Sequence, residues 1–378
     1  MNHVFSFRWT MYHPCTILKY IVFHFGRRTV SFAPGAHICG SWSPSAVRVT
    51  MRVAIVGAGW AGGRHADMFA SMKGVEIAAV VARSTTRAKT VAAKVHSEAT
   101  TDLGSVLRDD SIDAVDVCVP SGVHREIAVP ALEAGKHVFM ETPMALTAED
   151  ADAMVVAGRD NRRILGVAQL MKFVGPYVMI RKAFRDGDLG EPRMAHAARL
   201  SVAYWSERKP RDFSVYGDPM IELMIFEYEY LQWLFGSPRA VEARGVRGPT
   251  GAVLHALATL EYEDHLAFVE GSAMMPRSWP FTTYLRIQGT ASSLETRDRF
   301  LGGENPTTEF LRYRAEGTME PVEFQGQDPY FAECEHFVHC VSGKEDVEPI
   351  DGESAAKALA VALAARESVD RRKPVRIP

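Results

Sequence analysis

From residue 51 onward, short runs rich in β-branched residues alternate with alanine-rich stretches of helical length. This alternation predicts five strands separated by helices, with the strands at 52–56, 75–82, 114–119, 137–141 and 164–167. Strand–helix alternation with short turns forms right-handed β–α–β units, in which the strands lie parallel in one sheet. We therefore expect an α/β domain over residues 51–170.

The pattern changes after residue 170. Helices are predicted at 177–185, 219–235, 330–342 and 353–370. Between the second and third of these, five strands follow one another without intervening helices, at 240–246, 256–263, 267–273, 284–288 and 293–296. Consecutive strands indicate a large, mostly antiparallel sheet. We expect an α+β domain over 171–345, followed by a C-terminal helix and tail over 346–378.

Residues 1–50 differ in composition from the rest of the chain. They contain five Lys and Arg residues and no Asp or Glu, a charge of +5. Because the whole chain carries −3, the remaining 328 residues carry −8. Met51 stands directly before the first predicted strand. We interpret residues 1–50 as an extension outside the functional unit, either a mis-assigned start or a disordered segment, with a targeting role as the alternative.

Composition narrows the class of protein. A chain that is 47% hydrophobic and 24% charged is typical of a globular protein and predicts no membrane association. The acidic body predicts no nucleic-acid partner. Five cysteines without a CxxC motif argue against a disulfide framework and against a zinc site. We expect a cytoplasmic protein that binds no metal.

A glycine-rich turn follows the first predicted strand and opens the first predicted helix. It reads Gly57, Ala58, Gly59, Trp60, Ala61 and Gly62. The first glycine permits a tight turn, the second lets the backbone approach a pyrophosphate, and the third lets the helix pack closely on the strand. The helix N-terminus presents free N–H groups to phosphates. The motif therefore predicts a Rossmann dinucleotide-binding domain; a glycine-rich turn without a ligand is the alternative.

The end of the second predicted strand bears on the choice of dinucleotide. An acidic residue here normally binds the ribose 2′-hydroxyl of NAD, but the chain has Arg83, Ser84 and Arg87 and no acid. A carboxylate would repel a 2′-phosphate, whereas a guanidinium and a hydroxyl can bind one. NADP(H) is favoured and NAD(H) is the alternative. The other interpretation is that both arginines are simply solvated.

Several sequence motifs in addition to the glycine-rich turn are typical of one protein family. They are the extension of the turn to His65 and the segments 119–124 (VPSGVH), 134–141 (AGKHVFME), 184–192 (FRDGDLGEP) and 231–236 (LQWLFG). Together they resemble the Gfo/Idh/MocA family of NAD(P)-dependent oxidoreductases, and the resemblance spans residues 51–378. It implies hydride transfer to or from a small sugar-like or cyclitol substrate, a C-terminal domain for substrate binding and oligomerisation, and a homo-oligomer (dimer or tetramer). It also implies cofactor contacts from Pro120, Ser121, His124, Glu141 and Thr142.

The chain departs from the family's catalytic set of Lys, Asp and His. Thr142 stands at the Lys position, Glu222 at the Asp position and Phe226 at the His position. Phe226 cannot carry a proton, and Thr142 is neither a cation nor a useful acid near neutral pH. On one buried helix, Glu222, Phe226 and Glu229 would form a single stripe, and burial would raise the pKa of the Glu222 carboxyl. We expect Glu222 to be the catalytic acid–base, unless it only pairs with Lys172 or an arginine.

Lys172 is a second candidate, because it matches a basic residue that the family places on the pocket wall. A solvated lysine is the alternative. Two functional hypotheses follow. The chain is an NADP(H)-preferring oxidoreductase with an atypical proton relay, acting on a sugar-like, cyclitol or other carbonyl or alcohol substrate, or on an imine or enone that needs no such relay. Alternatively, it binds the cofactor as a sensor or partner subunit without turnover.

Overall fold

A computed structural model describes residues 51–203, 211–300 and 307–377; the expected extension at 1–50 lies outside this range. The N-terminal part is a parallel six-stranded sheet in the order β3-β2-β1-β4-β5-β6. Its strands are β1 (Met51–Val56), β2 (Val75–Val81), β3 (Glu98–Thr100), β4 (Ala114–Val117), β5 (His137–Met140) and β6 (Leu165–Val167). This is the predicted Rossmann fold. The short strand β3 was not predicted, because three residues carry too little periodicity.

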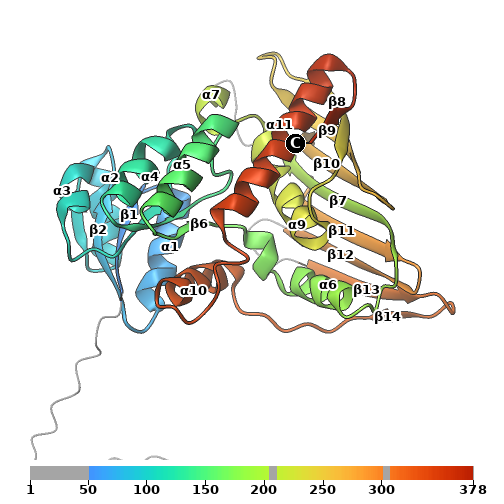
Figure 1. Cartoon of the computed structure of the whole chain (residues 1–378), viewed down its shortest axis with the longest axis horizontal. Coiled ribbons are helices and arrows are strands. Elements are labelled where there is room, and N and C mark those ends of the chain that lie inside the picture. The colour runs from blue at the N-terminus through green and yellow to red at the C-terminus, as the bar shows by residue number, and fades with distance from the viewer. Residues whose placement is uncertain (1–50, 204–210, 301–306, 378) are drawn as a thin grey trace, which may run out of the picture. The chain divides into compact units, whose positions relative to one another are not determined.

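Helices cover both faces of this sheet (Figure 1). They are α1 (Trp60–Ser71), α2 (Thr85–Lys94), α3 (Leu103–Arg108), α4 (His124–Glu133) and α5 (Ala148–Asp160). The chain leaves β1 toward β2 on one side and returns at β4 on the other, so the strand order reverses between β1 and β4. In open α/β sheets, ligands bind at such a switch point, beyond the carboxyl ends of the strands.

The C-terminal part is built on a nine-stranded sheet in the order β14-β13-β12-β11-β7-β10-β9-β8-β15. Its strands are β7 (Pro192–Val202), β8 (Ala240–Arg247), β9 (Val253–Glu261), β10 (Leu266–Met275), β11 (Phe281–Gly289), β12 (Ser292–Phe300), β13 (Thr307–Arg314), β14 (Met319–Pro321) and β15 (Val375–Arg376). Within the described part of the chain, neighbouring strands of this sheet pair antiparallel, except β10 and β7, which are parallel. The mostly antiparallel sheet was predicted, but its central strand β7 was not among the predicted strands.

The helices of the second half are α6 (Gly175–Arg185), α7 (Phe213–Tyr216), α8 (Pro219–Glu222), α9 (Ile225–Phe235), α10 (Pro329–Val341) and α11 (Gly352–Arg371), with short 3-10 helices η1 (Ser121–Val123) and η2 (Leu170–Phe173). The predicted helix 219–235 is interrupted at Leu223 and Met224. The expectation that Glu222 shares one continuous helix with Phe226 and Glu229 is therefore wrong. Among the described helices, none is long and apolar enough to cross a membrane.

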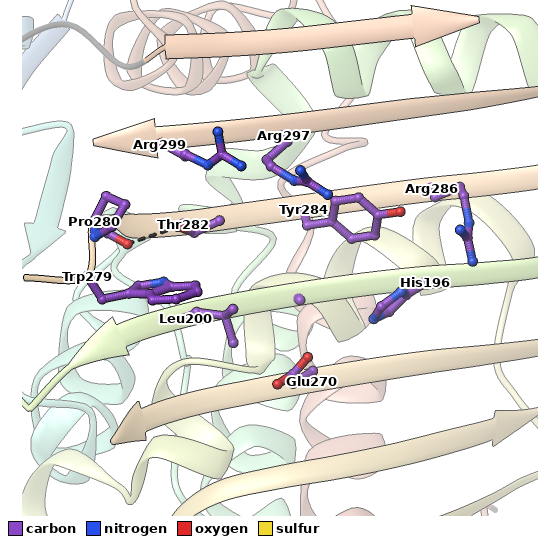
Figure 2. Close-up of a pocket in the computed structure, with 11 residues that line it drawn as sticks. His196, Leu200, Glu270, Trp279, Pro280, Thr282, Tyr284, Arg286, Arg297 and Arg299 are labelled. Carbon is purple, nitrogen blue, oxygen red and sulfur yellow. Dashed lines mark hydrogen bonds between the residues drawn. The ribbon is translucent and has the colours of Figure 1, made fainter. Parts of the chain in front are cut away.

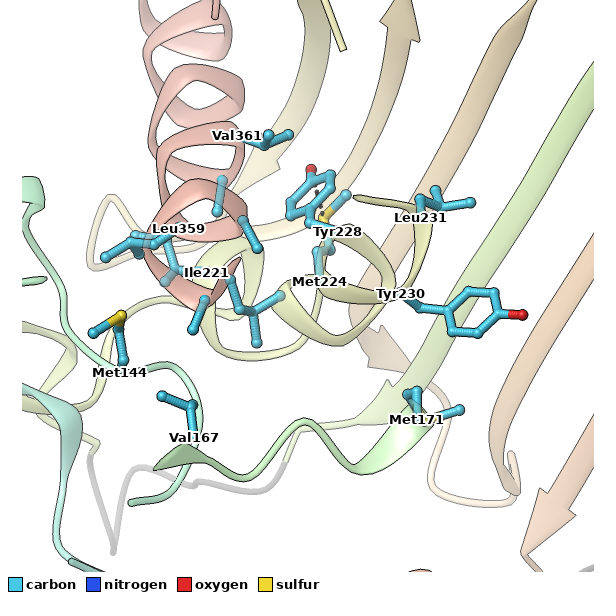
Figure 3. Packing of buried hydrophobic residues seen from close by; sticks show 14 of the residues in the cluster. Met144, Val167, Met171, Ile221, Met224, Tyr228, Tyr230, Leu231, Leu359 and Val361 are labelled. Carbon is cyan, nitrogen blue, oxygen red and sulfur yellow. Dashed lines mark hydrogen bonds between the residues drawn. The ribbon is translucent and has the colours of Figure 1, made fainter. Parts of the chain in front are cut away.

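Helix α9 is apolar on nearly all sides and is therefore buried. Tyr228 and Leu231 of α9 belong to the same buried cluster as Leu359 of α11. Met144 and Val167, from the ends of β5 and β6, belong to it too, and Figure 3 shows these layers side by side. One continuous core thus holds α9 against the edge of the Rossmann sheet. Helix α10 packs in turn against α1, and its Phe337 stacks on Phe139 of β5 at 4.9 Å between ring centroids.

The large sheet has two different faces, because side chains alternate along each strand. Ala195 and Leu285 face the core with α9 and α11. His196 and Tyr284, one residue away, line a hollow of about 620 Å3 on the opposite face (Figure 2). This hollow also contains Glu270, Trp279 and three arginines, Arg286, Arg297 and Arg299. The sheet face on which it lies carries exposed apolar side chains, including Leu257 and Phe268.

Candidate active site

The glycine turn has the geometry that a pyrophosphate requires. Gly57 has φ +126°, and a Cβ there would lie 2.1 Å from the Cys118 carbonyl oxygen. A Cβ on Gly62 would lie 1.9 Å from the Gly57 carbonyl oxygen, so only glycine lets α1 pack this closely on the turn. At Gly59, by contrast, a Cβ would meet no protein atom within 4 Å. The turn is closed toward the protein and open on the side where a ligand would lie.

The N-terminus of α1 fits an anion. Gly59 is its N-cap, and among the described residues no side chain caps it. The first turn contains no acidic residue. Unsatisfied N–H groups and the positive end of the helix dipole therefore point toward the open side of the turn. Ala58 and Ala61 add no charge, and the Trp60 ring is 73% exposed, 5.8 Å from the Tyr330 ring.

The structure brings Arg83, Ser84 and Arg87 together at the junction of β2 and α2. All three are exposed. The Ser84 Oγ accepts a hydrogen bond from the Arg87 backbone N–H at 3.4 Å and caps α2. Because β2 neighbours β1, these side chains lie on the side of the glycine turn where the adenosine ribose of a dinucleotide is held.

The loop after β4 lies on the other side of the glycine turn. Pro120 is partly exposed and Ser121 is nearly buried at the start of η1. The His124 ring nitrogens lie 2.8 Å from the Val119 carbonyl oxygen and 3.1 Å from that of Met144. Burial lowers the pKa of His124. This histidine therefore holds the loop from within, while Pro120 remains partly exposed.

A buried polar cluster lies under α1. The Nδ1 of His65 is 3.0 Å from an Asp116 carboxylate oxygen and 3.4 Å from the Cys118 Sγ, and its Nε2 is 3.4 Å from Glu141. Burial, the largest single effect, opposes the charged imidazolium, but Asp116, Cys118 and Cys334 together outweigh it and raise the pKa of His65 well above its usual value. The ligand atoms of His65, Asp116 and Cys118 lie within 4.8 Å of one another, close enough to suit a metal ion. Hydrogen bonds among His65, Asp116 and Cys118 account for these three side chains without a metal.

Thr142 follows Glu141 and meets a second buried carboxyl. Its Oγ1 donates a 2.5 Å hydrogen bond to Oε1 of Glu229 on α9. Burial raises the pKa of Glu229 to about 8, although the Thr142 hydrogen bond and the charge of Lys172 oppose the rise. The contact joins the end of the Rossmann sheet to the helix of the second domain.

Lys172 lies inside the protein and not on an open wall. It is 2% exposed, and its ammonium donates to the Pro349 carbonyl oxygen at 2.8 Å and approaches the Ser354 Oγ at 3.4 Å. Burial lowers the pKa of Lys172 to about 8, and Glu229 acts in the opposite direction. The expected direct contact of Lys172 with a substrate does not fit this enclosed position. Its charge instead acts on Glu229.

Glu222 ends α8 and forms an ion pair with Arg211. Its side chain is 24% exposed, so it is less enclosed than the expectation of a buried helix stripe required. Phe226 lies under the Arg199 guanidinium, 4.2 Å from the ring centre. Arg199 in turn forms a buried 2.8 Å ion pair with Glu227. Sequence reasoning did not single out Arg199 or Glu227, because nothing local marks a strand arginine as the partner of a helix carboxylate.

Two family models match the chain. The model of the oxidoreductase family with an NAD-binding Rossmann fold, GFO_IDH_MocA, matches residues 51–169, and that of the GFO/IDH/MocA C-terminal domain matches residues 177–295. The chain belongs to the Gfo/Idh/MocA family. It is therefore an oxidoreductase with a Rossmann domain for NAD(P).

Relatives extend over most of the chain. The UDP-N-acetylglucosamine 3-dehydrogenase of Acidithiobacillus ferrooxidans is 26% identical over 331 residues, which cover 85% of this chain and 98% of that protein. Its solved structure superposes with a TM-score of 0.73 at 25% identity, over 85% of this chain and 98% of that one. The scyllo-inositol 2-dehydrogenase (NADP(+)) of Bacillus subtilis is 26% identical over 297 residues, 76% of this chain and 87% of that protein.

Proposed function

We propose that this protein is an NADP(H)-preferring oxidoreductase that transfers hydride to or from a small sugar-like, cyclitol or other carbonyl or alcohol substrate. The observation that carries the proposal is the uncapped helix N-terminus behind an open glycine turn, with exposed Arg83 and Ser84 beside it. The substrate class is taken from relatives named as dehydrogenases of a nucleotide sugar and of an inositol.

The preference for NADP(H) rests on charge. The described turn between β2 and α2 offers two guanidinium groups and three hydroxyl groups, those of Ser84, Thr85 and Thr86, and no carboxylate. A 2′-phosphate gains charge-assisted hydrogen bonds in such a site, whereas a 2′-hydroxyl gains only neutral ones. One of the inositol-dehydrogenase relatives is named for NADP(+).

Different residues at the carboxyl ends of the Rossmann strands bind different parts of the cofactor. Gly59 and the N-terminus of α1 hold the pyrophosphate. The adenosine ribose is held by Arg83, Ser84 and Arg87. The nicotinamide half is faced by the start of η1 together with Glu141 and Thr142. A bound nicotinamide supplies a carbon that accepts or releases hydride. The protein must then move the substrate's hydroxyl proton, for which a positioned acid–base group contributes about 10²–10⁴ in rate.

Glu222 is one candidate for that group. Its carboxylate ends α8, is partly exposed to solvent and is held by an ion pair with Arg211. Lys172 is a candidate through its effect on Glu229 and not by touching the substrate. Replacing Glu222 by Gln distinguishes a proton carrier from a structural ion-pair partner. Turnover that survives in Glu222→Gln excludes Glu222 as the acid–base.

Cofactor binding tests the first half of the proposal. We expect a fluorescence titration of the full chain to give NADPH a dissociation constant at least tenfold below that of NADH. Loss of the Arg83 guanidinium in Arg83→Ala should weaken NADPH by about 10-fold or more and leave NADH nearly unchanged, because only the 2′-phosphate loses a charge-assisted contact. Lys89→Ala, an exposed cation further along α2, is the matched control. NADH binding tenfold more tightly than NADPH contradicts the preference.

Turnover tests the second half. Nicotinamide absorbance is followed with cyclitols, aldoses, keto sugars, UDP-N-acetylglucosamine, imines and enones. Oxidation or reduction of a sugar or cyclitol supports the proposal. Tight NADPH binding without any absorbance change across the panel supports the alternative of a sensor or partner subunit. Reaction with imines or enones alone supports a reductase that needs no proton relay.

We also propose that the protein is a cytoplasmic homo-oligomer. Exposed Leu257 and Phe268 on the open face of the large sheet are the observation that favours an assembly. A second copy of the chain offers the same face and therefore a self-complementary partner.

A further inference from the structure

We propose that Thr142 and Glu229 form a hydroxyl–carboxyl proton relay that replaces the lysine at this position in the family. The inference rests on the proposed oxidoreductase activity and names the groups that handle its proton. Thr142 is the residue that touches the substrate hydroxyl, and Glu229 behind it is the proton acceptor.

Position is the first argument. Thr142 lies just beyond the carboxyl end of β5, on the side of the switch point opposite β2. The adenosine half of the dinucleotide lies toward β2, so the nicotinamide half lies toward β4 and β5. Thr142 is only partly buried, whereas Glu229 is 2% exposed. A substrate can therefore reach the hydroxyl, but it can reach the carboxyl only through that hydroxyl.

Hydrogen bonding is the second argument. The Thr142 Oγ1 donates its proton in a 2.5 Å hydrogen bond to Glu229 Oε1. The lone pairs of Oγ1 itself are therefore available to accept a proton from another hydroxyl group. The other carboxyl oxygen of Glu229, Oε2, is buried without a hydrogen-bond partner among the described residues. A carboxyl with a short bond on one oxygen and a vacant second oxygen has room for a proton.

Electrostatics supports the arrangement. Burial raises the pKa of Glu229 to about 8, which suits a group that takes up and releases a proton near neutral pH. The charged groups that act on Glu229 come from four elements. They are Lys172 of η2, Arg199 of β7, Glu227 of α9 itself and Glu333 of α10. The Lys172 ammonium stabilises the carboxylate, and the two other carboxyls oppose it.

In the proposed reaction, every proton and electron that leaves the substrate has an acceptor. When an alcohol is oxidised, its C–H bond breaks, and an oxidised nicotinamide held in the cofactor site would supply the acceptor for the hydride and its two electrons. The substrate O–H proton passes to Thr142 Oγ1 as the Thr142 proton passes to Glu229 Oε1, and the substrate C–O bond becomes C=O. Reduction of a ketone runs through the same atoms in reverse. After product release, the Glu229 proton returns through Thr142 to water.

Four variants of the full chain test the relay in steady-state kinetics. The probe is the compound of the panel above that is turned over fastest. Thr142→Val keeps the side-chain volume without the hydroxyl, and Glu229→Gln keeps the shape without the proton acceptor. We expect kcat to fall about 10²–10⁴-fold in both, with KM and the NADPH dissociation constant within threefold of the parent. Thr142→Ser should stay within about fivefold, and Glu149→Gln, an exposed carboxylate on α5, should be unchanged.

The pH profile separates a relay from a structural role. In the parent protein, the rate of alcohol oxidation should rise through an ionisation near pH 8, and this ionisation should be absent from the residual activity of Glu229→Gln. A kcat within fivefold of the parent in Thr142→Val, or an unchanged ionisation in Glu229→Gln, overturns the proposal. An equally inactive Thr142→Ser also overturns it.

A readout without turnover keeps the relay testable if the proposed activity fails. Infrared spectra of the protein alone, titrated between pH 5 and 10, should contain a protonated carboxyl band that disappears near pH 8. The band should be missing in Glu229→Gln and shifted in frequency in Thr142→Val, because it reports the hydrogen bond between the two side chains. If no compound in the panel reacts, the oxidoreductase proposal fails. Absence of a titrating band that depends on Glu229 and Thr142 overturns the relay itself.

Discussion

At the scale of single residues, Glu229 governs part of the pH response of the folded protein. Its carboxyl has an ordinary pKa of 4.5, and burial raises it to about 8 in the folded state. A raised carboxyl pKa means that the folded state holds the proton more tightly than the unfolded state does. The stabilisation is complete below pH 4.5 and is lost as the pH rises toward 8.

The difference between the folded and unfolded pKa of Glu229 predicts that the free energy of unfolding changes measurably with pH. Between pH 5 and 8, the parent protein should lose stability relative to Glu229→Gln by up to about 1.4 kcal/mol per pH unit. Urea unfolding at a series of pH values measures it. The comparison cancels other buried groups that titrate in this range and are common to both proteins. Parallel stability curves for the two proteins would contradict the assignment of the raised pKa to Glu229.

Arg199 and Glu227 form a second buried pair, with a different consequence. Their side chains are 6% and 2% exposed, and Arg199 Nε also lies 3.0 Å and 3.2 Å from the two carboxylate oxygens. Arg199→Met should therefore destabilise the fold by about 3–5 kcal/mol, because it leaves a buried carboxylate unpaired. The double variant Arg199→Met/Glu227→Gln should recover part of this loss in denaturant unfolding. A double variant no more stable than the single one would argue against a pairwise cause.

At the scale of elements, the contact between α1 and the glycine turn after β1 decides whether the proposed cofactor site forms. Gly62→Ala would place a Cβ 1.9 Å from the Gly57 carbonyl oxygen, so α1 would have to move away from the turn. We expect NADPH binding to weaken by at least tenfold and the melting temperature to fall. Gly63→Ala is the matched control, because a Cβ there meets nothing within 4 Å and alanine favours a helix by about 0.5–1 kcal/mol. Equal effects of the two substitutions would show that packing against Gly57 is not the cause.

At the scale of the whole molecule, the open face of the nine-stranded sheet predicts self-association. Leu257 is 53% exposed and Phe268 40% exposed on neighbouring strands, β9 and β10. Burial of such side chains is worth about 1.5–3 kcal/mol each, and a carboxylate in their place must be desolvated. Leu257→Asp/Phe268→Asp should therefore shift the sedimentation mass from an oligomer to a monomer. Val178→Asp, on an α6 residue that is 43% exposed, should leave the mass unchanged. A monomeric parent protein would contradict the assembly.

How far the sequence predicts this molecule depends on the range of the interactions involved. The strands of the first sheet and the glycine turn could be located because alternating hydrophobicity, tight turns and glycine sterics act over a few residues. The break after Glu222 could not, because the apolar pattern continues through Leu223 and Met224 and carries no turn residue. The central strand β7 was missed, although its alternation places His196 and Arg199 on opposite faces of the sheet.

The sequence by itself determined the Rossmann fold of the first domain. It also predicted a cofactor site at Gly59 and the replacement of the family's usual catalytic side chains at Thr142 and Phe226, and these stay predictions. Only the tertiary structure placed Glu229 against Thr142, 87 residues earlier in the chain. The same packing enclosed Lys172, which local sequence left as an accessible candidate. The physical reason is that a turn or a helix is specified by its neighbours in the chain. The contact between the Thr142 hydroxyl and the buried Glu229 carboxyl depends instead on the hydrophobic core that packs α9 against the edge of the Rossmann sheet.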